Sequence, residues 1–293
     1  MEPTRRHFVS AMAAAPFLAA AAPGRLPIKK ALLLSGIQPR NASILDKFKI
    51  IKEAGFEQIE CPTTPEKDRA EEILAASKET GVRIHSIMNS DHWRYPLSSA
   101  DPAVVAKCME GMETSLRNAK LWGADTVLLV PAVVNPETPY SVAWERSQKK
   151  IRELIKLAAE LKVIIAVEEV WNKFLLSPVE FAKYVDDFNS PWVKAYFDVG
   201  NVAFYGYPHD WIRTLGKRIV KLHFKDFSYR KGVTAWTNLG EGDIDFVAIH
   251  SALADIGYQG SVTIEINGGE LAYWKDVNQR VERILSGQKP VAA

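Results

Sequence analysis

The stretch Val163-Ile164-Ile165-Ala166-Val167-Glu168 decides the fold: a short apolar run, rich in β-branched residues, ends in one carboxylate. A run of this kind is typical of a parallel strand that is buried on both faces. Residues 141–161 before it have the periodicity of a helix, and Ser177-Pro178-Val179-Glu180 after it has the signature of a helix start. The stretch is therefore a strand between two helices.

The same alternation continues in both directions along the chain. Apolar runs predict strands at residues 31–37, 56–61, 82–88, 126–130, 163–168, 193–198, 219–225 and 262–266. Helical periodicity predicts helices at residues 44–54, 66–80, 102–122, 141–161, 178–188, 209–215, 246–256 and 271–285. Repeated βα units demand a parallel sheet, and eight of them close most readily into a (β/α)8 TIM barrel, an α/β fold in one domain.

A doubly wound open sheet is the alternative architecture. It usually carries a glycine fingerprint directly after its first strand. The first predicted strand here ends in Ser35-Gly36-Ile37-Gln38-Pro39, which lacks that fingerprint. The barrel is therefore the better prediction.

The composition indicates a globular protein without a nucleic-acid partner. Of the 293 residues, 47% are hydrophobic and 25% are charged, and the net charge of +2 includes no dense basic block. The two cysteines, Cys61 and Cys108, fit no zinc or disulfide spacing and are interpreted as buried thiols.

The N-terminus predicts export. Paired arginines, Arg5 and Arg6, precede an alanine-rich apolar stretch that is too short to span a bilayer. We interpret residues 1–24 as a twin-arginine-type signal peptide and 25–293 as the barrel domain; a disordered alanine-rich tail is the alternative. The mature protein is expected to be periplasmic or otherwise extracytoplasmic, without stable membrane association.

Four polar residues end four successive predicted strands: Glu168, Asp198, His223 and Glu265. In a TIM barrel the carboxyl ends of the strands form the catalytic face. Alternation along the strands places His223 and Glu265 inward, with apolar neighbours facing the helices. Three buried carboxylates are strongly unfavourable together without a cation, so the quartet predicts a divalent metal site.

The chain resembles the xylose isomerase-like TIM barrel superfamily, in the branch that includes the D-tagatose and D-psicose 3-epimerases. The motifs that carry the resemblance are Val167-Glu168-Glu169-Val170-Trp171-Asn172, Tyr196-Phe197-Asp198-Val199-Gly200-Asn201, Leu222-His223-Phe224-Lys225-Asp226, Gly240-Glu241-Gly242-Asp243 and Thr263-Ile264-Glu265. The resemblance implies one Mn²⁺-, Co²⁺- or Mg²⁺-class ion on the quartet, with Glu168 and Glu265 also acting as general base and acid. One alignment of the motif would make Glu169 the metal ligand in place of Glu168. The alternation of side chains along the strand favours Glu168 as the ligand.

Six further residues are candidates for substrate binding: His85, His92, Trp93, Trp171, Asn201 and Lys225. His85 lies in the third predicted strand, and a core histidine is an equal interpretation. His92 and Trp93 lie in a long loop, where a lid that stacks on sugar is expected. Asn201 and Leu175 stand where the 3-epimerases carry a histidine and a glutamate, so the sugar contacts differ here.

These residues predict a sugar isomerase or epimerase that acts through an enediolate. Because export separates the protein from cytoplasmic sugar phosphates, we expect an unphosphorylated sugar or sugar derivative. The same site could eliminate a leaving group from a 3-keto-glycoside, as a lyase or hydratase. A nuclease like endonuclease IV and a non-catalytic sugar-binding protein are weaker alternatives, and association into a homo-oligomer is left open.

Overall fold

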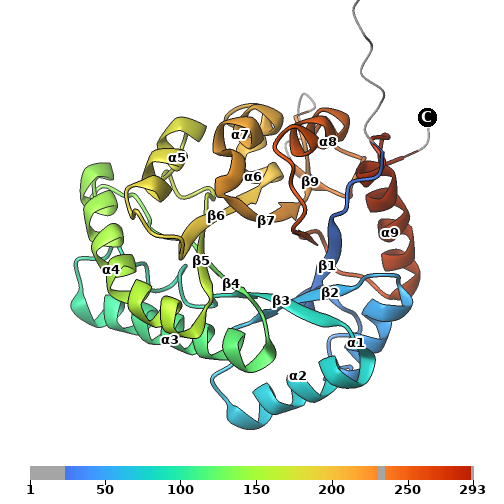
Figure 1. Cartoon of the computed structure of the whole chain (residues 1–293), viewed down its shortest axis with the longest axis horizontal. Helices are drawn as coiled ribbons and strands as arrows, with labels where there is room; N and C mark the ends of the chain where they lie inside the picture. Colours follow the sequence, from blue (N-terminus) through green and yellow to red (C-terminus); the bar gives the residue numbers. More distant parts are fainter. Residues whose placement is uncertain (1–23, 230–234, 292–293) are drawn as a thin grey trace, which may run out of the picture.

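Eight parallel strands close into a barrel in the order β1-β10-β7-β6-β5-β4-β3-β2 in the computed structural model, which describes residues 24–229 and 235–291 (Figure 1). The barrel strands are β1 (Lys29–Leu33), β2 (Gln58–Pro62), β3 (Arg83–Met88), β4 (Thr126–Leu129), β5 (Ile164–Glu168), β6 (Val193–Asp198), β7 (Ile219–Phe224) and β10 (Ser261–Ile264). The predicted (β/α)8 TIM barrel is confirmed.

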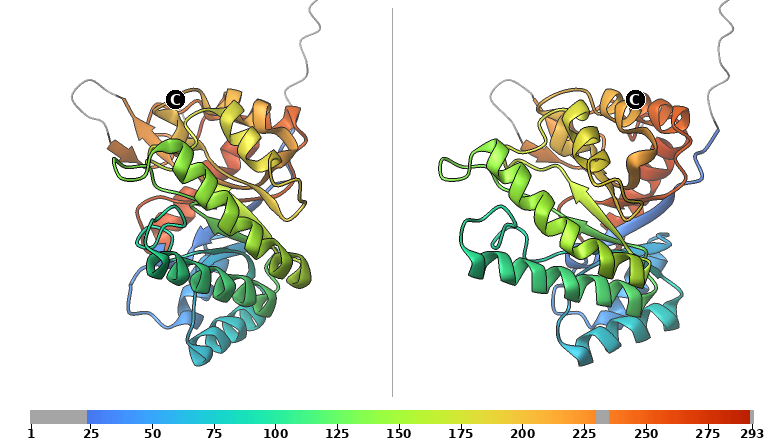
Figure 2. Two further views of the ribbon diagram at one scale, coloured as in Figure 1. Left: turned by 90° about the vertical axis from the view of Figure 1, so that its left-hand side faces the viewer. Right: turned by 60° about the vertical axis from the view of Figure 1, so that its left-hand side comes forward.

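Helices cover the outside of the barrel, and the long helices α3 and α4 lie side by side along it (Figure 2). The main helices are α1 (Ile44–Glu53), α2 (Lys67–Thr80), α3 (Pro102–Trp122), α4 (Tyr140–Leu161), α5 (Pro178–Asp186), α7 (Pro208–Leu215), α8 (Phe246–Asp255) and α9 (Leu271–Leu285). Among the described residues, no helix is both long and apolar enough to cross a membrane.

Local sequence signals set the ends of these helices. The Asp101 carboxylate accepts a hydrogen bond from a first-turn backbone N–H of α3 at 2.8 Å, and the Ser177 hydroxyl does the same for α5 at 3.2 Å. Gly81 and Gly123 end α2 and α3 with φ of 76° and 73°. A side chain is strained in this left-handed conformation, which explains glycine at both positions.

The main core lies between the strands and the surrounding helices. On β7, Leu222 and Phe224 belong to this core. A separate small cluster of buried residues, Leu128, Ala166 and Tyr196, fills the barrel interior. The two cysteines are free and buried, as predicted.

Three parts of the chain differ from the sequence prediction. Strand β1 spans Lys29–Leu33, not residues 31–37, because the segment after Leu33 turns into the 3-10 helix η1 (Leu34–Gly36). The sequence also did not predict the short helix α6 (Val199–Ala203) or the hairpin of β8 (Asp226–Ser228) and β9 (Ala235–Thr237). A second 3-10 helix, η2 (Gly216–Arg218), precedes β7. The proposed signal segment lies, except for its last residue, outside the described residues.

Candidate metal centre and active site

The barrel brings the predicted quartet together at the carboxyl ends of β5, β6, β7 and β10. One oxygen or nitrogen atom each of Glu168, Asp198, His223 and Glu265 lies within 4.8 Å of the others. His223 Nδ1 is the centre of the group, at 2.9 Å from Glu168 Oε1, 3.2 Å from Glu265 Oε2 and 3.6 Å from Asp198 Oδ2. The Glu265 side chain is 30% exposed and the other three are buried, so the cluster opens on the Glu265 side.

Asp198 has two roles in this arrangement. Its Oδ1 accepts hydrogen bonds from the backbone N–H groups of Gly200 and Asn201, at 2.7 and 2.9 Å, and so begins helix α6. Its Oδ2 is buried and accepts no hydrogen bond of good geometry, although Lys225 Nζ lies 2.9 Å away. Capping therefore fixes the carboxylate and leaves one oxygen facing the cluster.

Glu169 faces away from the cluster. Its Oε1 accepts a hydrogen bond from the backbone N–H of Asp198 at 2.9 Å, and its Oε2 is buried without a partner. Burial, with the nearby charges of Asp198 and Glu168, raises the pKa of Glu169 well above its ordinary value. Of the two adjacent glutamates, the structure thus places Glu168 in the quartet and Glu169 behind it.

The two glutamates of the cluster have pKa values shifted in opposite directions. Burial raises the pKa of Glu168 to about 7, against the opposing effect of His223. Burial acts in the same direction on Glu265, but His223 and Lys225 outweigh it and hold the pKa of Glu265 below its ordinary value. Two carboxyls with separated pKa values are suited to the two roles of acid and base.

The donor set fits a divalent cation. Carboxylate oxygens with one imidazole nitrogen suit Mn²⁺, Co²⁺ or Mg²⁺ better than a soft metal, which would favour thiolates. The buried Asp198 Oδ2, which accepts no hydrogen bond, faces the centre of the cluster. A cation there would offset the cost of gathering three carboxylates in a buried place.

A cavity of about 210 Å³ lies over the cluster. The residues that line it are Met88, His92, Trp93, Leu128, Glu168, Val170, Trp171, Asn201, Lys225, Trp236 and Glu265. Most of the predicted substrate-binding residues, namely His92, Trp93, Trp171, Asn201 and Lys225, are therefore positioned to meet a ligand. Met88 and Leu128, which also line the cavity, were not singled out from the sequence.

His85 does not line this cavity. It lies in the middle of β3, so its side chain points into the barrel below the rim, where Nε2 lies 3.0 Å from Thr263 Oγ1. Burial lowers the pKa of His85 well below its ordinary value, which keeps the ring neutral. The structure thus places His85 in the barrel interior, outside the residues that line the cavity.

His92 lines the cavity with a ring whose hydrogen position and charge are defined by its surroundings. The backbone N–H of Val130 donates to its Nδ1 at 3.2 Å, which places the ring hydrogen on Nε2. Burial lowers the pKa of His92 to about 3, so the ring is neutral at physiological pH. His92 can therefore offer one N–H donor to a ligand.

Aromatic rings form the outer wall. The rings of Trp171 and Trp236 lie 4.8 Å apart and are tilted by 30°. The indole N–H of Trp171 donates to the Asn201 carbonyl at 2.9 Å, and the side-chain amide of Asn201 donates to the Glu169 carbonyl at 2.8 Å. These bonds hold both side chains in place at the rim, while Trp93 is 55% exposed beside them.

The loop after β7 is organised by Asp226. Its carboxylate accepts hydrogen bonds from the backbone N–H groups of Phe227, Gly240, Gly242 and Ile244, at 2.8 to 3.3 Å. A Cβ on Gly242 would lie 2.2 Å from the Asp226 carboxylate, so only glycine fits there. This explains the Gly-Glu-Gly-Asp motif as a loop anchor.

Sequence reasoning missed one buried acid, Glu60 on β2. It lies beneath the quartet and contacts His223. Its only signal in the sequence is a charged residue in the otherwise apolar surroundings of Ile59 and Cys61. Alternation along the strand would have placed it inside the barrel.

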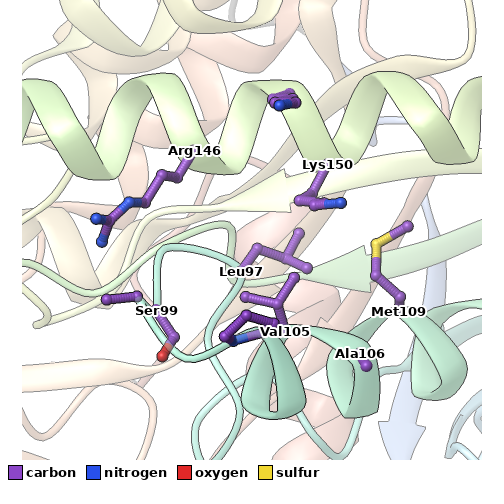
Figure 3. A pocket seen from close by; sticks show the side chains of 10 residues that line it. Leu97, Ser99, Val105, Ala106, Met109, Arg146 and Lys150 are labelled. Atoms are coloured by element: carbon purple, nitrogen blue, oxygen red, sulfur yellow. The ribbon is translucent and has the colours of Figure 1, made fainter.

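A second cavity lies between α3 and α4, on the outside of the barrel (Figure 3). Its volume is about 390 Å³, and Val105 and Met109 face Arg146 and Lys150 across it. No carboxylate and no histidine of the described residues lines it. Within the part of the chain that the structure describes, this cavity therefore offers no pair of groups for acid–base chemistry, unlike the smaller cavity over the quartet.

A parallel barrel with acids and a histidine at its carboxyl rim has the arrangement of a TIM-barrel enzyme, and the comparisons with known proteins place it among the sugar isomerases and epimerases. The chain belongs to the xylose isomerase-like TIM barrel family, which matches residues 48–284. L-ribulose-5-phosphate 3-epimerase UlaE of Escherichia coli K12 is 28% identical over 239 residues, which cover 78% of this chain and 84% of that protein.

Two further similarities agree with this membership. SgbU of Escherichia coli K12 is 30% identical over 236 residues, which cover 75% of this chain and 82% of that protein. The full name of that protein is "Putative L-ribulose-5-phosphate 3-epimerase SgbU". The structure of the 3-keto-D-glucoside 4-epimerase YcjR of Escherichia coli shares the fold, with a TM-score of 0.73 at 17% identity over 86% of this chain and 97% of that one.

Proposed function

We propose that this protein is a divalent-metal-dependent isomerase or epimerase that acts on an unphosphorylated sugar or sugar derivative through an enediolate. The observation that carries the proposal is the pair of carboxyls, Glu168 and Glu265, that belong to the quartet and line one cavity. Isomerisation and epimerisation both need one group to remove a proton beside a carbonyl and another to return it.

The quartet of Glu168, Asp198, His223 and Glu265 would hold one Mn²⁺, Co²⁺ or Mg²⁺ ion. Such an ion, when bound, supplies Lewis acidity that stabilises negative charge on neighbouring sugar oxygens. Asp198 contributes the oxygen that its capping role leaves free, and His223 contributes Nδ1.

The chain's own residues account for the proton transfers. One glutamate takes the proton from the carbon next to the carbonyl, and the electron pair of that bond forms the double bond of the enediolate. The other glutamate returns a proton to the opposite face or to the neighbouring carbon. His92 would donate its Nε2–H to a sugar oxygen, and the tryptophans at the rim would contact the apolar face of the ring.

The lining of the cavity favours a substrate without phosphate. The related proteins UlaE and SgbU are named for a phosphorylated pentulose. Among the described residues that line this cavity, Lys225 is the only cation, and Asp198 and Glu265 already engage it. A phosphate is usually bound by unpaired arginines or lysines or by a helix N-terminus. The predicted export to the periplasm agrees with this choice.

A second candidate is elimination from a 3-keto-glycoside, which begins with the same proton removal. Trp171 and Trp236 at the mouth of the cavity remain 43% and 42% exposed, so an aglycone attached to the sugar could stack there. Release of a free aglycone would identify this reaction.

The test is metal analysis of the purified protein followed by a deuterium-exchange screen in D2O. Free ketoses, aldoses and 3-keto-glycosides are compared with L-ribulose 5-phosphate. We expect solvent deuterium at a carbon next to the carbonyl of an unphosphorylated substrate, and loss of that label in Glu265→Gln. Exchange only with the phosphorylated sugar would overturn the substrate class, and exchange that survives in Glu265→Gln would overturn the assignment of the acid and base.

A further inference from the structure

A third glutamate, Glu60, lies inside the barrel directly below the quartet. Its side chain is fully buried, and one oxygen, Oε2, carries all of its contacts. Tyr196 Oη lies 2.5 Å from Oε2, Thr263 Oγ1 lies 2.8 Å from it, and His223 Nε2 lies 3.2 Å from it. Three side-chain donors thus converge on a single carboxylate oxygen.

The directions of these hydrogen bonds follow from the groups involved. The hydroxyls of Tyr196 and Thr263 both donate to Glu60 Oε2. Thr263, having given its hydrogen to Glu60, accepts from the Nε2–H of His85 at 3.0 Å. His223 Nε2 lies 3.2 Å from Glu60 Oε2 and forms the third hydrogen bond to that oxygen.

This hydrogen bond decides which nitrogen of His223 faces the quartet. With Nε2–H bound to Glu60 below, Nδ1 points to Glu168, Glu265 and Asp198 above, at 2.9, 3.2 and 3.6 Å. A histidine that binds a metal through one ring nitrogen commonly donates its other N–H to a carboxylate, which fixes the tautomer and orients the ring.

We propose that Glu60 is a positioning residue for the metal site: it holds His223 in the Nε2–H tautomer and aims Nδ1 at the ion. The proposal rests on the metal dependence put forward above. It assigns Glu60 no contact with substrate, because Glu60 does not line the cavity. The competing explanation is that Glu60 only satisfies the buried hydroxyls of Tyr196 and Thr263.

Mn²⁺ titration of the full chain against a chelating dye separates the two explanations. Glu60→Gln removes the charge and keeps the size of the side chain. We expect it to weaken Mn²⁺ binding about 10- to 100-fold, the usual effect of losing such an outer partner. Tyr196→Phe is the matched control: it removes one donor to Glu60, leaves the bond to His223 and should change the Kd less than about threefold.

The histidine tautomer gives a second readout that does not depend on activity. In the Mg²⁺-loaded wild type, ¹⁵N NMR should show His223 with its hydrogen on Nε2, and in Glu60→Gln a mixture of tautomers. A wild type with the hydrogen on Nδ1 would overturn the proposal even if Glu60→Gln failed to fold.

The outcomes also distinguish this proposal from the proposed function. A wild type that binds Mn²⁺, with a folded Glu60→Gln that binds it equally well, overturns the positioning role alone. A wild type that binds no Mn²⁺, Co²⁺ or Mg²⁺ overturns both. Circular dichroism and thermal unfolding of the metal-free variants establish that they are folded.

Discussion

The ammonium group of Lys225 lies 2.9 Å from Asp198 Oδ2, so a cation already occupies the edge of the cluster that would hold the metal. The same Nζ lies 2.8 Å from Glu265 Oε2 and 4.9 Å from the centre of the Trp236 ring. Gly200 makes room for it, because a Cβ there would lie 2.4 Å from Lys225 Cγ. Lys225 thus neutralises two acids when no divalent ion does.

We predict that Lys225→Met binds Mn²⁺ about tenfold more tightly than the wild type, because a like charge beside the ion is removed. Deuterium exchange into the substrate should fall at least about tenfold, since the lysine also lines the cavity. Titration against a chelating dye measures the first effect and NMR the second. The matched control is Lys221→Met on β7, four residues before Lys225, whose ammonium pairs with Asp125 at 2.7 Å. Weaker Mn²⁺ binding by Lys225→Met would show that the lysine supports the site and does not compete with the ion.

The adjacent glutamates should respond differently to the same substitution. Glu168→Gln removes a proposed ligand and is expected to weaken Mn²⁺ binding at least about 100-fold. Burial raises the pKa of Glu169 well above its ordinary value and so favours the neutral form, which Gln resembles. Glu169→Gln should therefore keep Mn²⁺ binding within about threefold and the unfolding temperature within a few degrees. The reverse pattern in metal titrations would assign the ligand to Glu169.

The barrel could be predicted because each βα unit is specified by neighbouring residues. The apolar run 163–168 and the Ser177 cap need no information from distant parts of the chain. The end of β1 could not be found this way. The predicted strand continues to Ile37, but pairing with β10 ends at Leu32 and pairing with β2 ends at Leu33, and that register is a property of the closed barrel.

The quartet could be predicted because strand ends and alternation determine both the depth and the direction of a side chain. His85 and Glu60 show the limit of this reasoning. Both face inward, yet neither reaches the cavity, because the stagger of the strands sets the height of each residue in the barrel. The hairpin of β8 and β9 could not be predicted from the sequence either, because it depends on backbone N–H groups that converge on the Asp226 carboxylate in the folded chain.

His92 should contribute to binding of the substrate and leave the metal site unchanged. In His92→Asn the side-chain oxygen can still accept the Val130 N–H, while the Nε2–H donor to the cavity is lost. The loss of one hydrogen bond, worth about 1 kcal/mol, should raise KM roughly five- to tenfold. In His92→Leu the Val130 N–H also loses its partner, so that variant alone should lose about 1–3 kcal/mol of stability. Steady-state kinetics and chemical unfolding give the two readouts, and equal KM values for wild type and His92→Asn would exclude the contact.

The ion pairs between the start of β1 and α9 should make stability depend on acid pH. Glu282 accepts hydrogen bonds from Arg25 Nε at 2.7 Å and Nη2 at 3.1 Å, and it also pairs with the buried Lys30. The Arg25 hydrogen bonds, with help from Lys30, lower the pKa of Glu282 from 4.5 to about 2. Because the folded state holds the ionised form, this stabilisation is complete above pH 5 and disappears as the pH falls to 2.

The substitution Glu282→Gln should accordingly cost about 1 kcal/mol of unfolding free energy at pH 7, a figure reduced for solvent screening because the carboxylate is 37% exposed. The difference from wild type should shrink steadily between pH 5 and pH 2, as measured by urea unfolding across that range. Glu53→Gln, which breaks the exposed pair with Lys275, is the control and should stay within about 0.5 kcal/mol throughout. A loss in Glu282→Gln that is equally large at pH 2.5 and pH 7 would mean that packing of α9, and not the charge of Glu282, holds β1 in place.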